Sequence, residues 1–488
     1  MVQSEPITDI ALNTLNKNKQ ALIFVNTKRS AESCAEKISI KLKSNQETIE
    51  LSEKVLKFLS KPTKQCKRLS KCILKGIAFH HSGLHPKQRE LIENCFRTGS
   101  IKIICCNPTL AMGLDLPAFR SIIRDVKRFS SMGMVNIPVL EYLQMAGRAG
   151  RPDFDDFGEA ILIANSDAEK NGLIEKYIYG EPEDIFSKLA VEPVLRVYLL
   201  SLIVSKVIRS PDDIFDYFSK TFWAFQYKDM DKLKSIISRV LKMLEKWGFI
   251  QFVDNKYYRA TLIGTRVSEL YLDPATAIHI IKGIENSVST EKSLVWLHLL
   301  SDTLEMRPQL RVKTKEFEEI ENKTLEYEND FLIPEPSMFD PEYCDWMNAF
   351  KTALMFDDWL EEKDEEYILE KYDCRPGETR AKLNIIDWLV YSSEELARLI
   401  GKMNLITPLK RLRLRLKHGI REELLPLIKF EGIGRARARK LFKAGVKDAG
   451  DVKKTDFEKL SSILTPKLAL NLKKQVGSSG LPERLSKF

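Results

Sequence analysis

The sequence lacks the features that mark secreted, membrane-spanning and metal-stapled chains. Its 488 residues contain no run of eighteen apolar residues, so no membrane-spanning helix is expected. The first fifteen residues show no basic segment followed by an apolar one, so no secretory signal is expected either. None of the eight cysteines forms a C-x-x-C pair, which favours reduced cytoplasmic thiols over a disulfide framework or a metal site.

Positive charge is concentrated near the C-terminus. The net charge is +9, yet residues 401–488 contain 22 Lys and Arg against 8 Asp and Glu, while residues 1–400 contain 55 against 60. Such an asymmetry predicts a C-terminal segment that faces nucleic acid. A charged end that only raises solubility is the alternative.

The first part of the chain alternates strand-like and helix-like segments. Short apolar runs are found at 21–26, 76–83, 101–107, 120–126 and 159–165. Between most of them lie helical patterns, one of which begins at Pro86. Strands separated by helices predict an α/β domain with a parallel sheet, which we place at residues 1–184.

The remaining chain is mainly helical. Three amphipathic segments (192–206, 211–225 and 231–248) precede two short strands around a turn at Asp254 and Asn255. Three helices followed by a hairpin indicate a winged helix over residues 185–275. A nearly all-helical region (276–400) and the basic segment (401–488) follow.

One segment combines small residues with two arginines. Residues 141–160 contain the pattern Q-x-x-G-R-x-G-R, with Gln144 one turn before Arg148 and with Arg151 three residues further on. The glycines suggest a helix start, where both guanidinium groups would face one anion. Guanidinium matches phosphate or carboxylate oxygens, so the alternative is a bridge to Asp153 or Asp155 in the following loop.

Three further segments complete a recognisable set. They are LIFVNTKRSAE (22–32), AFHHSGL (78–84) and NPTLAMGLDLPA (107–118). Together with the arginine segment, and in this order, they resemble motifs four to six of the superfamily-2 helicases. The resemblance implies a RecA-like domain, the second of two, in which Gln144, Arg148 and Arg151 serve ATP hydrolysis and the arginines contact the γ-phosphate.

The same resemblance implies further contacts. Asn26 and Thr27 would touch nucleic-acid phosphates, and Thr109 would touch the strand backbone. Gly113 and Asp115 would approach the nucleotide, although many relatives carry asparagine at the position of Asp115.

Two adjacent histidines lie on a predicted strand. Their side chains would point to opposite faces, which argues against a metal pair formed by His80 and His81. The resemblance places His81 among the residues that contact DNA.

Three other segments narrow the resemblance. They are SKLAVEPVLRVYLLSLI (187–203), TRVSELYLDPATA (265–277) and YDCRPGETRAKLNIIDWLVYSS (372–393). They are similar to the archaeal Holliday-junction-migration helicases, which are relatives of helicase Q. The resemblance implies that a ratchet domain (276–400) follows the winged helix and that a helix-hairpin-helix domain (401–488) ends the chain.

In that family a long helix lies across the single strand. Trp388 matches its base-stacking tryptophan, and stacking on a flat aromatic ring is tolerant of base sequence. The family arginine seven residues earlier is replaced by Ala381, so Arg380 or Lys382 would stand in for it. A purely structural core position for the tryptophan is the alternative.

The family also inserts a duplex-splitting hairpin between motifs five and six. The matching segment is KRFSSMGMVNIPVLEY, in which Phe129, Met132 and Met134 would wedge against a base pair. A surface loop is the alternative.

Near the C-terminus, FEGIGRARARKLFKAGV (430–446) resembles a helix-hairpin-helix. Gly432 and Gly434 allow a tight turn whose amides would bind phosphate, with Arg435, Arg437 and Arg439 around it. Alternating arginines on a helix do not share one face, so we expect some of them to be structural.

The sequence has neither a G-x-x-x-x-G-K-[S/T] loop nor a D-E-x-H segment, which hold ATP and Mg²⁺ in such enzymes. We therefore expect a fragment or a split-gene subunit that is inactive without an N-terminal ATP-binding domain. With that domain it would be a monomeric 3′-to-5′ motor on single-stranded and forked DNA, in a nucleoid-associated cytoplasmic setting. A non-catalytic DNA-binding protein and an exosome-type RNA helicase are the alternatives.

Overall fold

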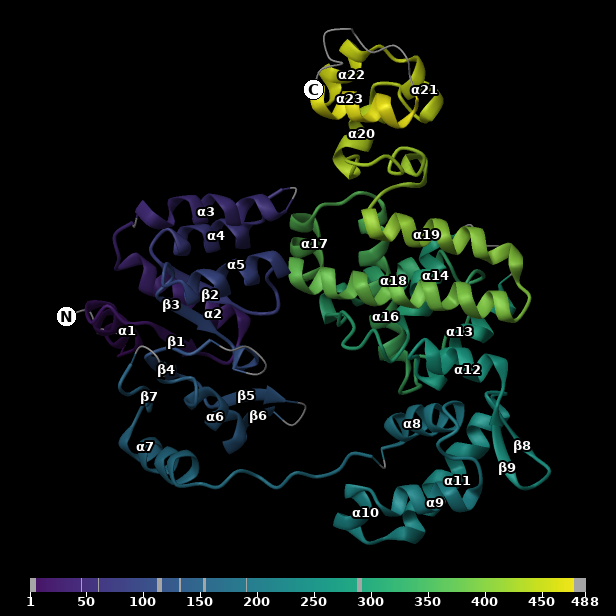
Figure 1. Ribbon diagram of the computed structural model, residues 1–488, viewed down its shortest axis with the longest axis horizontal. Helices are drawn as coiled ribbons and strands as arrows, with labels where there is room; N and C mark the ends of the chain where they lie inside the picture. Colours follow the sequence, from purple (N-terminus) through teal and green to yellow (C-terminus); the bar gives the residue numbers. More distant parts are fainter. Residues whose placement is uncertain are drawn as a thin grey trace. The chain divides into compact units, whose positions relative to one another are not determined.

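The computed structural model describes residues 6–44, 46–59, 61–111, 116–130, 133–151, 155–189, 191–287 and 292–477, without the side chains of 129 and 130. The chain forms two compact units. One contains the residues up to Ile185 together with Glu365–Arg380, and the other contains Phe186–Asp364 and the residues from Ala381 onward. Figure 1 labels the elements of both units.

The first unit is built on a five-stranded parallel sheet in the order β2-β3-β1-β4-β7. The strands are β1 (Ala21–Phe24), β2 (Ile77–His80), β3 (Ile103–Cys106), β4 (Arg120–Ile123) and β7 (Glu159–Leu162). The first four strands are buried throughout, as is typical of a parallel sheet covered by helices. The predicted α/β fold with a parallel sheet is thereby confirmed.

The first unit also contains eight α-helices among its described residues. They are α1 (Pro6–Asn16), α2 (Lys28–Ile40), α3 (Ile49–Lys54), α4 (Lys64–Ile73), α5 (Pro86–Arg97), α6 (Val139–Ala146), α7 (Asp167–Leu173) and α17 (Glu365–Tyr372). Local sequence explains several starts, because Thr27 and Thr63 cap α2 and α4 through their side chains, and Pro86 occupies the first turn of α5. Short helical turns lie at Gln46–Thr48, Val55–Phe58, Pro108–Leu110 and Ile174–Ile178.

The first unit also contains a separate antiparallel hairpin, which follows β4 and precedes α6 in the chain. It consists of β5 (Lys127–Ser130) and β6 (Gly133–Asn136), with Lys127 paired with Asn136. The expected hairpin is therefore present.

The second unit begins with helices and a small hairpin. Its elements are α8 (Glu192–Val204), α9 (Pro211–Ser219), α10 (Phe222–Tyr227), α11 (Met230–Lys246), β8 (Ile250–Val253), β9 (Tyr257–Ala260) and α12 (Leu262–Glu269). The segment expected as one helix over 211–225 is two, because Thr221 is extended and caps α10 by accepting from the Ala224 amide. Asp254 and Asn255 both have positive φ, which makes the predicted turn between the strands.

The rest of the second unit is helical. It contains α13 (Pro274–Asn286), α14 (Ser293–Ser301), α15 (Phe317–Leu325), α16 (Tyr343–Leu360), α18 (Pro376–Leu399), α19 (Ile406–His418), α20 (Arg435–Lys443), α21 (Ala449–Lys454), α22 (Phe457–Ile463) and α23 (Pro466–Gln475). Short turns lie at Thr314–Glu316, Met403–Leu405 and Glu422–Leu424. The first turn of α18 belongs to the first unit. The C-terminal helices share a small core of their own that includes Ile433, Leu441 and Leu472.

Two features bear on the chemistry of the chain. Seven cysteines are buried and Cys344 is exposed. Within the described residues, no helix combines the length and apolarity that a bilayer crossing requires.

A buried carboxylate on α2 joins several parts of the first unit. The side chain of Glu32 is 4% exposed and accepts from Arg68 Nη1 at 2.6 Å, from Gln65 Nε2 at 2.7 Å and from His81 Nε2 at 3.1 Å. Burial alone would raise the pKa of Glu32, but these hydrogen bonds and the neighbouring positive charges outweigh it and lower the pKa to about 2.

This pKa predicts a pH-dependent contribution to stability. A depressed pKa in the folded state stabilises the fold above the unfolded-state pKa, and the benefit is lost as the pH falls through the folded-state pKa. At pH 7 the free energy of unfolding of wild type should exceed that of Glu32→Gln by up to about 3 kcal/mol. This difference should shrink as the pH falls below about 5. Hydrogen exchange of β1 peptides measures this, with Glu50→Gln as the exposed control. A difference that is constant from pH 7 to about pH 3 would contradict the assignment.

Candidate nucleotide and nucleic-acid interface

The arginine segment follows a helix and does not begin one. Helix α6 ends at Ala146, and residues 147–151 form a turn that pairs with the chain before β4, through an Ala118–Ala149 bridge. The predicted helix start was wrong because Gly147 caps α6 and Gly150 adopts φ +93°. A Cβ on Gly158 would lie 2.2 Å from the Gly150 nitrogen, so glycine allows this close approach.

Arg151 is held by two groups of its own domain. Its Nε and Nη2 donate to Asp155 at 2.6 and 3.1 Å, and its Nη1 donates to Gln20 Oε1 at 2.6 Å. The bridge to Asp155, left open by the sequence, is thus present. The Asp155 side chain is 1% exposed, and the hydrogen bond from Arg151 lowers its pKa despite that burial, helped by Lys19. Sequence reasoning missed Gln20, a buried amide directly before β1.

Both arginines nevertheless line an open cleft. The cleft has a volume of about 940 Å³, and its wall includes Gln20, Lys102, Arg148, Arg151 and Phe157. Arg148 Nη2 donates to the Ala111 carbonyl at 2.5 Å. Gln144 is exposed on α6, one turn before the segment. Guanidinium groups beside an open cleft suit an anionic ligand that approaches from outside the domain.

The residues of motifs four and five that are predicted to contact nucleic acid lie at the same edge of the sheet. Strands β1 and β3 are neighbours with Phe24 opposite Cys106, so the residues that follow each strand leave the sheet side by side. Asn26 is partly buried, whereas Thr27 and Thr109 are exposed. The Thr27 hydroxyl is engaged as the cap of α2, and the Thr109 hydroxyl donates to Asn107 at 2.9 Å.

His81 does not fit its predicted role. Its side chain is fully buried, its Nε2 faces Glu32, and its Nδ1 accepts from the Gly83 amide at 3.1 Å. Burial lowers the pKa of His81, and the accepting Nδ1 requires the neutral ring. We therefore correct the assignment, because a buried ring with both nitrogens engaged cannot reach DNA. His80 faces Glu93 instead, at 2.9 Å.

Several predicted positions fall outside what the structure describes. Gly113 and Asp115 lie outside the described residues, so their predicted approach to the nucleotide stays a prediction. Phe129 belongs to β5, but its side chain is not described, and Met132 lies outside the described residues. Met134 on the partner strand is 58% exposed.

Trp388 lies at the border between the core of the second unit and its surface. It is partly buried, its indole nitrogen donates to the Leu270 carbonyl at 3.0 Å, and Leu389 beside it is fully buried. One helical turn away on α18, the Tyr391 ring lies 4.8 Å from the Arg413 guanidinium. Sequence reasoning missed this second aromatic, which the three-residue spacing from the tryptophan could have indicated.

Arg380 and Lys382, the candidate substitutes for the family arginine that Ala381 replaces, differ in their surroundings. Arg380 is exposed on α18. Lys382 donates to the Pro308 carbonyl at 2.6 Å, which holds its ammonium group against the backbone. Arg380 is therefore the more accessible of the two candidates, and a DNA contact by either residue stays a prediction.

The helix-hairpin-helix arginines have divided roles. Gly432 has φ +80° and Gly434 caps α20, so the tight turn is present. Arg435 lies 4.9 Å over the Trp359 ring and donates to the Lys363 carbonyl at 3.0 Å. Arg437 is exposed and donates to the Gly432 carbonyl at 2.7 Å.

This division makes Arg437 the better candidate for a phosphate contact. Arg437→Gln should weaken single-stranded DNA binding and reduce the slope of log affinity against log salt by about 0.7, the value for one phosphate on a single strand. Fluorescence anisotropy across a salt series measures both quantities. Arg439→Gln is the matched control, because that arginine pairs with Glu362 and Glu423 within the second unit. An unchanged slope in Arg437→Gln would remove it from the interface.

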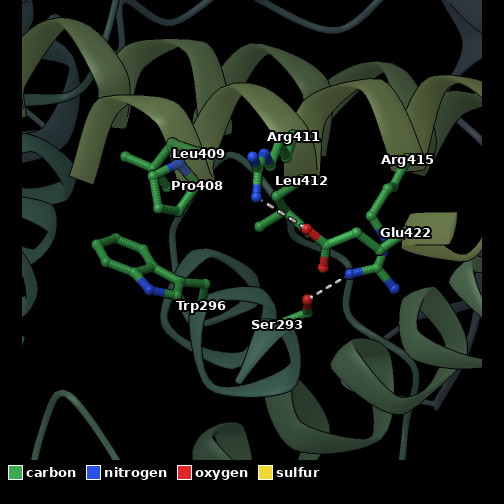
Figure 2. Close-up of a pocket in the computed structure, with 8 residues that line it drawn as sticks. All are labelled: Ser293, Trp296, Pro408, Leu409, Arg411, Leu412, Arg415 and Glu422. Atoms are coloured by element: carbon green, nitrogen blue, oxygen red, sulfur yellow. Dashed lines mark hydrogen bonds and ion pairs between the residues drawn. The ribbon is translucent and has the colours of Figure 1, made fainter. Parts of the chain in front are cut away.

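The arginines of α19 are largely engaged within the second unit. Figure 2 shows Arg411 directed at Glu422 and Arg415 directed at Ser293, at 3.2 and 2.9 Å. The pocket between them has a volume of about 170 Å³, below the range of about 300–1,000 Å³ of typical ligand sites. The positive charge of this helix therefore serves packing as well as any external contact.

Comparison with known proteins covers most of the chain. The helicase conserved C-terminal domain family matches residues 4–153, a helix-turn-helix domain family matches 158–251, and the family described as archaeal helicase, domain 4 matches 294–419.

Three of the similar proteins are ATP-dependent DNA helicases named Hel308. The chain is 36% identical over 530 residues to the ATP-dependent DNA helicase Hel308 of Methanococcus vannielii, covering 99% of this chain and 69% of that protein. It is 36% identical over 486 residues to the Hel308 of Methanocella arvoryzae, covering 97% and 65%. For the Hel308 of Pyrococcus horikoshii, identity is 37% over 449 residues, covering 91% and 62%. The chain thus spans about two thirds of the length of these relatives.

Proposed function

Because the chain belongs to the Hel308 family of ATP-dependent DNA helicases, we propose that it is the part of a DNA motor that completes the nucleotide pocket and holds the DNA strand. The complete motor moves 3′-to-5′ on single-stranded DNA and unwinds forked or branched DNA in repair and replication restart. It works as a monomer in the cytoplasm, on the nucleoid.

The open cleft beside Arg148 and Arg151 carries this proposal. Their N–H groups bind phosphate oxygens of ATP that is held mainly by an N-terminal RecA-like domain, where ATP supplies the phosphoryl chemistry. When a phosphate binds, the Arg151 guanidinium breaks or shares its ion pair with Asp155. The hydrogen bond to Gln20 keeps this guanidinium near the cleft.

The residues present suit phosphate better than magnesium. Asp155 lines the cleft but is already paired with Arg151 and Lys19. Among the described residues no group of three or more His, Cys, Asp or Glu side chains is placed to hold a metal ion. We propose that the ATP-binding domain supplies the ligands of Mg²⁺.

Three surfaces of the chain serve the DNA. Thr27 and Thr109 flank one sheet edge, Trp388 offers an aromatic surface, and Arg437 projects from the helix-hairpin-helix. Phosphate contacts and stacking of this kind bind a single strand without regard to its sequence, which suits translocation.

The test is reconstitution. The chain is mixed with, or fused to, the N-terminal third of the Methanococcus vannielii relative, which carries the length that this chain does not cover. ATP hydrolysis stimulated by single-stranded DNA is expected only when both parts are present. DNA binding with no such hydrolysis would favour a non-catalytic DNA-binding role, and stimulation by RNA alone would favour an RNA helicase.

A further inference from the structure

Helix α12 ends in a turn of a kind that usually contains glycine. Leu270 caps the helix, and Tyr271 follows it with φ +58°. The Tyr271 amide donates to the Ser268 carbonyl at 3.1 Å, and the Leu272 amide donates to the Val267 carbonyl at 3.2 Å. These two hydrogen bonds define a Schellman motif, in which glycine is the usual residue at the left-handed position.

Helix α11 of the same unit shows the usual form of this motif. There the left-handed residue is Gly248, with φ +74°. Its amide donates to the Glu245 carbonyl at 2.8 Å, and the Phe249 amide donates to the Leu244 carbonyl at 3.0 Å. Residues other than glycine are strained in this conformation, and bulky ones most of all. Among the described non-glycine residues with positive φ, Tyr271 is the only aromatic.

Packing within the fold does not explain this tyrosine. Tyr271 is 85% exposed, whereas Leu270 and Leu272 on either side of it are 6% and 1% exposed. The fold would therefore be more stable with glycine at this position, because glycine removes the strain and an exposed ring contributes little burial. A strained residue whose side chain faces solvent points to a role in binding.

The turn lies beside Trp388, within the second unit. The Trp388 indole nitrogen donates to the Leu270 carbonyl at 3.0 Å. Because a carbonyl oxygen lies about 2.8 Å from the next Cα, the indole nitrogen is within about 6 Å of the Tyr271 Cα. On the other side of the turn, Asp273 accepts from Arg196 at 2.6 and 2.9 Å. The backbone that carries the exposed ring is thus held from both sides.

We propose that Tyr271 is a further base-stacking residue, which binds a nucleobase of the single strand next to the base on Trp388. An aromatic ring stacks on any base, so this contact is tolerant of base sequence. The fixed turn sets the direction of the ring relative to the indole, so less conformational freedom is lost on binding. This inference rests on the proposed function, because it requires a single strand at Trp388.

Replacing Tyr271 with glycine separates a binding role from a structural one, because the two readouts should move in opposite directions. Tyr271→Gly should raise the Tm of the second unit by roughly 1–4 °C, since glycine removes the strain. All six tryptophans lie in this unit, so thermal unfolding followed by tryptophan fluorescence reports on it. Lys206→Gly is the matched control, because Lys206 occupies the same position of the motif after α8, with φ +61°, and should show a similar gain.

The second readout is DNA affinity, measured by fluorescence anisotropy. Tyr271→Gly should bind a labelled single-stranded oligonucleotide roughly 5- to 150-fold more weakly than wild type. Its affinity for an abasic strand of the same length should stay within about twofold of wild type, because tyrosine adds no charge to the phosphate contacts. Tyr271→Phe keeps the ring and should retain the affinity of wild type for both strands.

A lower Tm in Tyr271→Gly would show that the ring stabilises the fold and would overturn the proposal. An equal loss of affinity for the abasic strand would overturn it too, since the contact would then not involve bases. If wild type binds neither strand, the proposed function fails together with this inference. If wild type binds the base-bearing strand and Tyr271→Gly binds it equally well, this inference alone fails.

Discussion

Replacing Arg151 with alanine should lower DNA-stimulated ATP hydrolysis of the reconstituted enzyme by about 10³-fold or more, because an arginine that stabilises charge on a transferring phosphoryl group contributes about 10³–10⁵ in rate. Arg151→Lys should recover little, since an ammonium group cannot form the planar two-pronged contact. The measurement is the steady-state rate at saturating DNA.

Two controls separate this role from a structural one. Asp155→Asn removes the charge that Arg151 faces in the structure and should leave most of the rate, because the arginine still reaches the cleft and Gln20. Arg307→Ala removes an exposed arginine paired with Asp345 and should change nothing. If Arg151→Ala destabilised the fold while hydrolysis per folded molecule stayed normal, the role of the arginine would be structural, through its ion pair with Asp155.

Trp388→Ala should weaken binding of single-stranded DNA by about 1–3 kcal/mol, or roughly 5- to 150-fold, because stacking of one base on an aromatic ring is worth that much. Trp388→Phe should lose less, since it keeps an aromatic face, although it gives up the hydrogen bond to Leu270. Anisotropy with labelled oligonucleotides measures the affinity.

The matched control for the tryptophan is Phe339→Ala, which removes an aromatic side chain that is 89% exposed. Its affinity should equal that of wild type. Loss of the cooperative unfolding transition in Trp388→Ala would mean that the ring is mainly a core residue, as its partial burial also allows.

Structural features that depend on neighbouring residues could be predicted from the sequence. The five sheet strands follow from short apolar runs, and the start of α5 follows from Pro86. The turn at Asp254 and Asn255 follows from the tolerance of these residue types for positive φ. The family followed from motif order, and similarity to the Hel308 proteins confirms it.

Features that depend on contacts between residues far apart in the sequence could not be predicted. Nothing near His81 in the sequence shows that Glu32 would bury it, and nothing near Arg151 indicates Gln20, which lies 131 positions away. Residues 365–380 read as part of a helical domain, because their partners in the α/β unit are about three hundred positions earlier. The fourfold domain division stays a prediction.

The distribution of the cysteines limits where the chain reacts with electrophiles. Burial raises the pKa of Cys72 to about 12 and raises those of Cys105 and Cys106 as well. A thiol with a raised pKa forms little thiolate, and thiolate is the reactive species. Cys344, at the solvent-facing start of α16, is the one sulfhydryl among the eight that reagents in solution reach directly. A single dye or spin label can therefore be attached to the native chain without removing any other cysteine.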